Sequence, residues 1–497
     1  MSKFTKKIII NSGIYENRVA ILDNEILEEY YVEQKDTQHL YGNIYKGIVE
    51  SVLPGLGAAF VNIGTSKNGF LYISDVLDKT PQDIADEEEI IIEKEKKRNT
   101  DIGSLLKVRQ EIIVQVDKEP VGTKGPRLTS HVSLPGRYLV LTPFDESIGI
   151  SKRISDLNER NRIRGVLNQM NLPKGMGFII RTAAKDVDEK SLKREIKYLI
   201  NLWARIMYRS KKIGALAVLY EEYDLILRIV RDQFTDDVEK IAIDSKDKYK
   251  RIIRFLSYFM PALRSRIFFY NGISPIFEKY GIEQEIEKIF ERKIDLKSGG
   301  SIFIEQTEGM VAIDVNTAKY KGKRDIDETI FNTNLEAARE IARQIRLRDV
   351  GGIIIIDFID MRSKAHKQKV QETLESNLKK DKAKTNILSI SSIGVVEMTR
   401  QRMRRNLEST MYKKCPYCSG RGLVKSDTTI AMQILRKVEK AASGTKKREM
   451  KVRVHPDIHN FLVKNEKEMI LPLMRRCRMK IQFFADYNLQ LEKVEVE

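Results

Sequence analysis

The sequence of 497 residues contains only three cysteines, too few for a disulfide framework in a chain of this length. It has no apolar run near the roughly 18 residues that a membrane-spanning helix needs. The stretch from Met1 to Asn11 has basic residues but too short an apolar core for a signal peptide. No repeat with a period of about 20 to 50 residues is visible. We therefore expect a cytoplasmic protein of several domains, without a membrane span or a disulfide scaffold.

Acidic side chains are outnumbered in this sequence. The chain has 70 Asp and Glu against 88 Lys and Arg, which gives a formal net charge of +18 and a pI of about 9.4. An excess of this sign and size favours a polyanionic partner. Nucleic acid is the first candidate, and an anionic membrane surface is the second.

The most informative pattern lies in residues 299–361 and predicts one β-α-β unit. An apolar strand ends at Asp314, and residues 325–348 follow with acids at the start and apolar side chains at helical spacing. Two glycines then precede Ile353 to Ile356, and Asp357 ends that run. Four successive isoleucines favour a strand that is covered on both faces, as in a parallel sheet.

This unit predicts a metal site. A right-handed crossover places the carboxyl ends of its two strands side by side, so Asp314 and Asp357 should meet there, with the amide of Asn316 nearby. Two close carboxylates repel each other unless a cation lies between them, and oxygen ligands favour magnesium or manganese. Such an ion could activate water for hydrolysis of a phosphodiester. Alternatively, each aspartate only begins a loop, and the residues alone do not distinguish Asp357 from Asp360.

Short strands punctuated by glycines begin at Gly42 and predict a small OB-type barrel. Such a barrel binds single strands through exposed aromatic rings and basic side chains, for which Phe60, Phe70 and Lys124 are candidates. The alternative is that both phenylalanines belong to the barrel core. The charged residues 80–101 predict a solvated helix or loop.

The next segments alternate strands and helices between residues 134 and 209. One strand ends in Arg181-Thr182, and a guanidinium with a neighbouring hydroxyl can bind a terminal phosphate. This dipeptide alone does not predict a phosphate site. Residues 223–232 predict a further strand, and residues 246–259 predict a helix.

The C-terminal region is basic and holds the cysteines. The cluster from Arg400 to Arg405 could be a solvated basic face, but its place after the predicted metal site favours a path for RNA. Cys415-Pro-Tyr-Cys418, followed by glycines, allows three interpretations: a redox pair, two buried free thiols, or half of a zinc site. Zinc needs four ligands, so two chains would each contribute a pair. Cys477 is expected as a buried thiol, and residues 428–497 as a small α+β unit for dimerisation.

Several of these segments resemble the ribonuclease E/G family of endoribonucleases. The resemblance lies in Ala-Ile-Asp314-Val-Asn316, in the run from Phe331 to Ala338, in Arg346 to Gly352 and in Ile356 to Met361, and it covers nearly the whole chain. It implies that Asp314 and Asp357 hold the catalytic magnesium, with Asn316 assisting. It therefore favours Asp357 over Asp360.

The resemblance also gives roles to the other candidates. Phe60, Phe70 and Lys124 match the RNA-binding barrel of the family. Arg181 and Thr182 match the pocket that senses a monophosphate at the 5′ end of RNA, and further residues match its lining: Gly136, Val140 and Lys152, where Lys152 replaces a family arginine. Cys415 and Cys418 match the link in which two protomers share one zinc ion.

The implied fold class is multidomain α+β. The implied domains are an RNase H-like domain formed by two separate segments at 1–41 and 223–290, an OB-fold RNA-binding barrel at 42–128 with its charged insertion near 80–101, a 5′-sensor domain at 129–222, a DNase I-like catalytic domain at 291–411, a zinc link at 412–424 and a small dimerisation domain at 425–497. The RNase H-like domain of the family is structural, so its acids are not expected to be catalytic: Asp232, Asp236, Asp237 and Asp244.

We therefore expect a magnesium-dependent endoribonuclease that cleaves single-stranded RNA, prefers 5′-monophosphorylated ends and leaves 5′-phosphate and 3′-hydroxyl products. The resemblance implies roles in rRNA processing and mRNA decay. It also implies a homodimer through shared zinc, with a tetramer as a further option. The rival interpretation is a non-catalytic RNA-binding or ribosome-associated protein.

Overall fold

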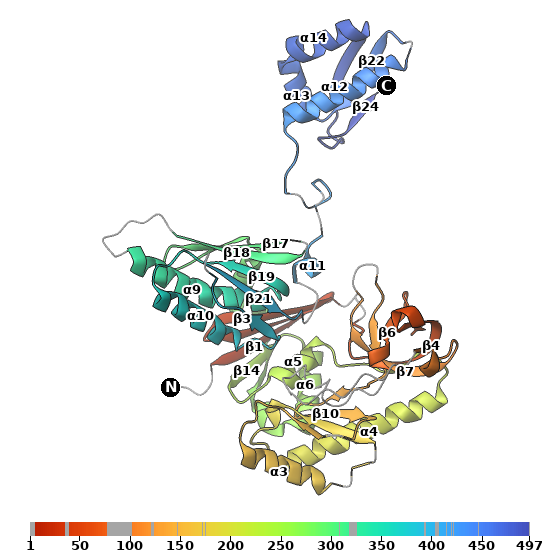
Figure 1. Cartoon of the computed structure of the whole chain (residues 1–497), viewed down its shortest axis with the longest axis vertical. Coiled ribbons are helices and arrows are strands. Elements are labelled where there is room, and N and C mark those ends of the chain that lie inside the picture. Colours follow the sequence, from red (N-terminus) through yellow and green to blue (C-terminus); the bar gives the residue numbers. More distant parts are fainter. Residues whose placement is uncertain are drawn as a thin grey trace. The chain divides into compact units, whose positions relative to one another are not determined.

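A computed structural model of the chain shows a mixed α+β structure built on five sheets in its described residues (Figure 1). It describes all residues except 1–4, 35–38, 77–101, 121–123, 147, 171, 174, 308, 318–325, 392–393, 403–406, 414, 419, 421, 446 and 497. The chain divides into two compact units, residues 1–407 and 408–497. The predicted charged insertion at 80–101 lies outside the described residues.

A five-stranded sheet joins the N-terminal segment to residues far along the chain. Its order is β15-β14-β1-β2-β3, with β1 parallel to β14 and antiparallel to β2. Its elements are β1 (Lys6–Ser12), β2 (Glu16–Asp23), β3 (Ile26–Gln34), α5 (Leu225–Gln233), β14 (Val238–Ile243), α6 (Lys246–Phe259), η5 (Pro261–Arg266), β15 (Ile267–Phe269), α7 (Ile276–Lys279) and α8 (Ile282–Ile289). Ile8 and Ile10 pack towards α5 and α6, whereas Ile9 packs towards α7 and α8. Helices therefore cover both faces of this sheet.

Residues 223–232 form a helix, so the predicted strand is wrong. Helix α5 begins after Asp224, whose carboxylate accepts a hydrogen bond from the backbone N–H of Leu227 at 3.1 Å. A short apolar run does not distinguish a strand from a buried helix by its periodicity. The N-cap at Asp224 favours the helix.

Five strands close into an OB-like barrel, which confirms the predicted barrel. The barrel closes because β4 pairs with β7 as well as with β5. Its elements are β4 (Ile44–Leu53), η1 (Pro54–Leu56), β5 (Ala58–Asn62), β6 (Gly69–Tyr72), η2 (Ile73–Asp75), α2 (Ile102–Leu105), β7 (Glu111–Lys118) and β8 (Arg127–Thr129), and β13 (Ala217–Tyr220) pairs with the outside of β4.

A four-stranded sheet follows the barrel, in the order β11-β12-β10-β9. Its elements are β9 (Leu134–Pro135), β10 (Leu139–Pro143), β11 (Ile148–Ile150), α3 (Leu157–Asn168), β12 (Met176–Ile180), η4 (Thr182–Ala184) and α4 (Glu189–Lys212). Asp156 and Asp188 cap the N-termini of α3 and α4. Leu192, Ile196 and Trp203 of α4 are buried in the core of this layer.

The largest core belongs to a six-stranded sheet of order β16-β17-β18-β19-β21-β20. Its elements are β16 (Lys293–Asp295), β17 (Ser301–Gln306), β18 (Met310–Asn316), α9 (Ile326–Leu347), β19 (Gly352–Asp357), α10 (Lys364–Leu378), β20 (Thr385–Ile387) and β21 (Val395–Arg400). Strands β18 and β19 are parallel and are joined by α9, as the sequence predicts. Strand β21 is antiparallel to β19, so the sheet is mixed.

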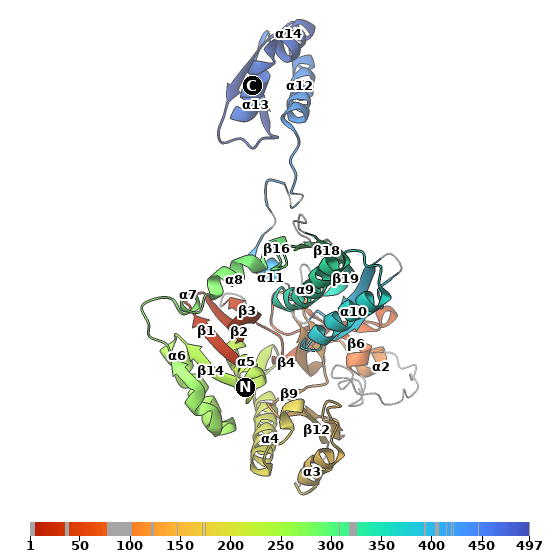
Figure 2. The ribbon, with the colours of Figure 1, turned by 90° about the vertical axis from the view of Figure 1, so that its left-hand side faces the viewer.

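Among the residues that the structure describes, helices pack on only one face of this sheet. Helices α9 and α10 lie side by side against it in Figure 1 and in Figure 2, and their apolar side chains form one core with alternate strand residues. Ile354 and Ile356 are fully buried, whereas Ile353 is 51% exposed. The prediction that the isoleucines are covered on both faces is therefore wrong, because both helices lie on the same side.

Arg400 belongs to the interior of this layer and not to an RNA path. Its guanidinium donates to Asp381 at 2.7 Å, to Asp349 at 2.8 Å and to the carbonyl of Val350 at 2.8 Å. Its side chain is only 4% exposed. The predicted RNA contact is wrong for Arg400, and residues 403–405 of the same cluster lie outside the described residues.

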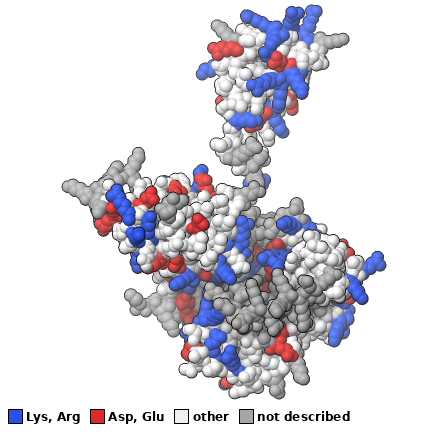
Figure 3. All heavy atoms as spheres, in the orientation of Figure 1, with Lys and Arg blue, Asp and Glu red and all other residues white. Residues whose placement is uncertain are grey.

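The C-terminal unit is a small α+β layer, as predicted. Its sheet has the order β23-β22-β24, and its elements are α12 (Asp427–Ser443), β22 (Glu449–Val454), α13 (Pro456–Lys464), α14 (Glu466–Cys477), β23 (Lys480–Ala485) and β24 (Val494–Val496). The short helix α11 (Leu407–Met411) begins at the last residue of the first unit. Lysine and arginine side chains crowd its visible face in Figure 3. Across the described residues of the chain, no helix has the length and apolar character needed to cross a membrane.

The buried ion pairs of Arg400 give a stability prediction. Arg400→Ala should lower the free energy of unfolding of the 1–407 unit by about 3–5 kcal/mol, because Asp381 and Asp349 lose the cation that neutralises them in the interior. Urea unfolding measures this change. The control Lys369→Ala removes one partner of an exposed pair with Glu372 at 3.5 Å and should cost less than about 1 kcal/mol. Equal costs for the two variants would contradict the assignment.

Candidate active site and RNA contacts

Two carboxylates lie side by side on the open face of the six-stranded sheet. Asp314 of β18 and Asp357 of β19 are paired in the parallel register, so their strands lie about 4.7–4.9 Å apart at this level. Both residues are exposed, and their chain neighbours Ile313 and Ile356 point into the core. Asn316 lies two residues further along the same face, and its Nδ2 donates to Asp314 Oδ2 at 2.5 Å.

Electrostatics at this pair favours a cation. Partial burial and the like charges of Asp314 and Asp360 raise the pKa of Asp357 above its usual value. No group of three or more His, Cys, Asp and Glu side chains with metal-binding spacing occurs within the described residues. The candidate ligands at this edge of the sheet are the two carboxylates and the Asn316 amide, which the strand register brings together. This set fits magnesium, which takes one or two carboxylates and keeps several waters.

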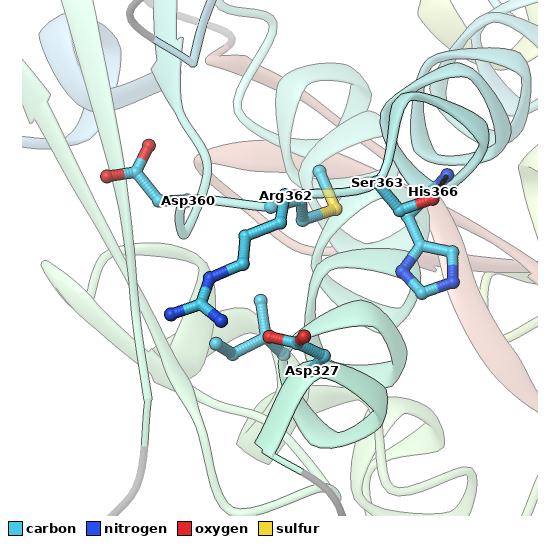
Figure 4. Close-up of a pocket in the computed structure, with 7 residues that line it drawn as sticks. Asp327, Asp360, Arg362, Ser363 and His366 are labelled. Atoms are coloured by element: carbon cyan, nitrogen blue, oxygen red, sulfur yellow. Dashed lines mark hydrogen bonds between the residues drawn. The ribbon is translucent and has the colours of Figure 1, made fainter.

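Beyond the end of β19, Asp360 lines a neighbouring pocket. The pocket has a volume of about 270 Å³, and it is lined by Asp327, Ile330, Asp360, Met361, Arg362, Ser363 and His366. Figure 4 shows the guanidinium of Arg362 extending towards the Asp327 side of this pocket. The ring of His366 stacks on Phe331, with centroids 4.1 Å apart. Sequence reasoning missed this pocket, because it combines the first turn of α9 with the segment from Asp360 to His366 that follows β19.

Phe60 and Phe70 lie outside the barrel core. They are paired across β5 and β6, and their ring centroids lie 5.7 Å apart in an edge-to-face arrangement. Neither ring joins the apolar core of the barrel. Tyr72 extends this group, with its centroid 6.2 Å from that of Phe70 and 42% exposure. The alternative that the phenylalanines are core residues is therefore wrong, and Tyr72 is an addition that the sequence did not indicate.

Lys124 lies close to the turn that precedes β6, the strand of Phe70. It is exposed, and the following Gly125 is packed against the turn before β6. A Cβ at Gly125 would lie 1.9 Å from the carbonyl oxygen of Asn68, so only glycine allows this approach. The contact brings the Lys124 backbone to the strand that carries Phe70.

Arg181 and Thr182 follow strand β12 and meet the other predicted lining residues. Arg181 Nη1 donates to the carbonyl of Gly136 at 2.7 Å and to Asp232 Oδ1 at 2.8 Å. Its Nε and Nη2 have no hydrogen-bond partner among the described residues. Thr182 Oγ1 lies 3.2 Å from the hydroxyl of Ser151. The neighbouring Lys152 is exposed.

Gly136 and Val140 complete this group through the edge of the four-stranded sheet. A Cβ at Gly136 would lie 2.2 Å from Glu195 Oε1, so no larger residue fits there. Val140 pairs with Pro135 and with Ile179, next to the end of β12. The structure thus gathers all five predicted sensor residues around one strand end.

Two acids shape the charge around Arg181. Burial opposes ionisation of Asp232, but the charges and hydrogen bonds of Arg231 and Arg181 outweigh it and lower the pKa of Asp232 to about 2. Burial raises the pKa of Glu195 to about 7, although its carboxylate accepts hydrogen bonds from the backbone N–H groups of Tyr138 and Leu139. Asp232 is therefore an anion at neutral pH and anchors the Arg181 guanidinium.

Two further acids next to the N-terminal sheet make contacts that are separate from those of Asp232. Asp237 pairs with Lys6 at 2.8 Å, and Asp244 accepts hydrogen bonds from Asn11 at 2.6 Å and from the backbone of Ser12 at 2.9 Å. These acids therefore serve different local contacts.

Cys415 and Cys418 lie in a turn that is accessible on the C-terminal unit. Cys415 is exposed, so the interpretation as two buried thiols is wrong for it. The N–H of Gly422 donates to the sulfur of Cys418 at 3.3 Å, and Gly422 has a φ of +69°. The turn precedes α12, which begins at Asp427, whereas a redox pair would start a helix. Cys477 is partly buried, which raises the pKa of its thiol.

Comparison with known proteins identifies the family. Residues 133–403 match the ribonuclease E/G family, and residues 414–497 match a domain described as RNase E/G, thioredoxin-like. The chain is 42% identical to ribonuclease G of Escherichia coli strain K12 over 87% of each chain, and 38% identical to ribonuclease G of Haemophilus influenzae over 97% of each. It is 36% identical to ribonuclease E of H. influenzae over 96% of this chain and 50% of that protein.

The description of residues 414–497 as thioredoxin-like adds to the predicted small α+β unit, for which the sequence indicated no such likeness. The matches over the rest of the chain agree with the resemblance seen in its motifs. On the length and identity of these matches, the chain belongs to the ribonuclease E/G family.

Proposed function

We propose that this chain is a magnesium-dependent endoribonuclease that hydrolyses single-stranded RNA to 5′-phosphate and 3′-hydroxyl products. The observation that carries the proposal is the pairing of Asp314 with Asp357 on the open face of a sheet. Membership of the ribonuclease E/G family supports it. The fit of the ligand set to magnesium supports it as well.

Asp314 and Asp357 would hold the ion, with Asn316 assisting. A bound magnesium ion would polarise a phosphoryl oxygen and favour an activated water. The hydrogen bond from the Asn316 amide fixes the orientation of the Asp314 carboxylate. Because the helices of this layer pack on the opposite face, an extended strand of RNA can approach the pair.

The barrel would bind the RNA strand away from the cleavage point. Phe60 and Phe70 offer rings for stacking of bases, and Lys124 offers a cation for the phosphate backbone. Stacking of this kind tolerates every base, which suits an enzyme of single-stranded RNA.

Arg181 and Thr182 would bind a 5′-terminal monophosphate. Gly136 and Asp232 occupy Nη1 of Arg181, so its Nε and Nη2 would donate together to two phosphate oxygens. The hydroxyl of Thr182 and the ammonium of Lys152 would add to this contact. A terminal hydroxyl cannot use these donors in the same way, so monophosphorylated RNA would be preferred.

Cys415 and Cys418 would supply half of a zinc site, and a second protomer would supply the rest. Their accessibility and the Gly422 amide near Cys418 suit a thiolate site. The resulting assembly would be a homodimer, or a tetramer built from two such dimers. We further infer a cytoplasmic role in rRNA processing and mRNA decay.

Asp314→Asn and Asp357→Asn should each lower the cleavage rate by at least about a hundredfold while RNA binding persists, because several kcal/mol of transition-state stabilisation are lost. Cleavage of a single-stranded oligonucleotide with magnesium measures the rate, and gel shift measures binding. Glu372→Gln on α10 is the matched control and should cleave normally. Full cleavage by both aspartate variants would contradict the site, and binding without cleavage by the unmodified protein would favour the RNA-binding rival.

Arg181→Gln should remove the preference for 5′-monophosphate over 5′-hydroxyl ends, because the forked donor is lost. Cleavage rates of two oligonucleotides that differ only at the 5′ end give the preference. Arg205→Gln, an exposed arginine of α4, is the control and should retain it. A preference that persists in Arg181→Gln would argue against this pocket.

Cys415→Ser combined with Cys418→Ser should release zinc and convert the assembly to smaller species, because each protomer loses both its ligands. Light scattering gives the mass, and elemental analysis gives the zinc content. Cys477→Ser should change neither quantity. An unaltered mass in the double variant would refute the shared zinc.

A further inference from the structure

A row of five residues crosses the open face of the six-stranded sheet at the level of the carboxylate pair. Successive strand registers pair Lys293, Phe303, Asp314, Asp357 and Val395. Residues paired in this way point to the same face of a sheet. Ile302 and Ile304, which flank Phe303 on β17, are buried in the core under the helices. The ring of Phe303 therefore lies on the open face, one strand from Asp314.

Phe303 has no role in the apolar core. Its side chain is half-buried, and it neither joins the core cluster nor contacts another aromatic ring among the described residues. An isolated exposed phenylalanine needs no explanation by itself. This ring is of interest because it lies beside the two carboxylates of the proposed cleavage site.

Lys293 ends the same row on the far side of Phe303. Its ammonium pairs with Asp295 at 2.7 Å, and both side chains are more than half exposed. A surface pair of this kind is weak, so a phosphate can replace Asp295 as the partner of the ammonium. The order along the row is then a cation, an aromatic ring and a metal-binding pair, which is the order of phosphate, base and scissile phosphate along an RNA strand.

We propose that Phe303 stacks the base of a nucleotide adjacent to the scissile phosphate and that Lys293 contacts the next phosphate. The proposal rests on the nuclease site at Asp314 and Asp357. Its occupant is single-stranded RNA, because the cation and the ring complement a phosphate and a base. Val395, on the opposite side of the pair, offers no ring. The flanking base is therefore held on the β17 side.

The test uses 5′-hydroxylated oligonucleotides with one cleavage site, so that the 5′-phosphate pocket plays no role. Phe303→Val should raise KM about tenfold with kcat within about twofold, which is the loss of one stacked base. Phe303→Tyr keeps the ring and should restore KM. The control Ile355→Val, on the same face, should leave KM unchanged. Lys293→Gln should raise KM equally for all the oligonucleotides.

Abasic nucleotides placed one at a time around the cleavage site identify the base. For the unmodified protein, an abasic nucleotide at one flanking position should raise KM about tenfold. For Phe303→Val, the abasic nucleotide should not raise KM further at that position, and at the other positions it should have the same effect as for the unmodified protein. The proposal would be overturned if Phe303→Val left KM unchanged, if it lowered kcat alone, or if abasic nucleotides raised its KM further by the same factor at every position.

Light scattering completes the test. A lower mass in Phe303→Val would mean that a second copy covers the ring, and it would overturn the proposal. Failure of the unmodified protein to cleave any of these RNAs would overturn the nuclease assignment as well. If the unmodified protein cleaves normally and Phe303→Val has the same KM, only the stacking proposal fails.

Discussion

The parallel pairing of β18 with β19 is the constraint on which this protein depends. In this register two residues that lie far apart in the chain, Asp314 and Asp357, become neighbours. Their like charges raise the free energy of the free pair, and a divalent cation would relieve that repulsion. A shift of β19 by one residue would turn its aspartate towards the core and bring Ile356 to the open face. The apolar contacts that bury Ile354 and Ile356 therefore also hold the position of the carboxylate.

The two faces of this sheet differ, because one is packed by helices and the other carries the carboxylate pair. Helices α9 and α10 bury one face, and the network of Arg400 with Asp381 and Asp349 holds the end of β21 to the turn before β19. On the opposite face Asp314 and Asp357 are exposed and Phe303 is half-buried. Helices on both faces would have buried more apolar surface, but they would also have covered the two carboxylates.

Several polar contacts join the layers of the 1–407 unit. Arg343 of α9 donates to the carbonyl of Leu27 in β3 at 2.9 Å, which ties the six-stranded sheet to the N-terminal sheet. Asp232, at the end of α5, holds Arg181 of the four-stranded sheet at 2.8 Å. The N-terminal sheet therefore connects the predicted phosphate pocket with the layer of the carboxylate pair, and this structural role agrees with the separate local contacts of its acids.

The sequence by itself determined the β-α-β unit, the barrel and the spacing of the cysteines, because hydrophobic periodicity and glycine placement are local signals. It did not determine the helix at residues 225–233, since a short apolar run is compatible with two conformations until Asp224 caps one of them. Only the tertiary structure decided three further features: the burial of Arg400, the exposure of Ile353 and the position of Phe303 beside Asp314. Each follows from which strand or carboxylate becomes a neighbour across the fold, and such long-range pairing leaves no mark on local sequence.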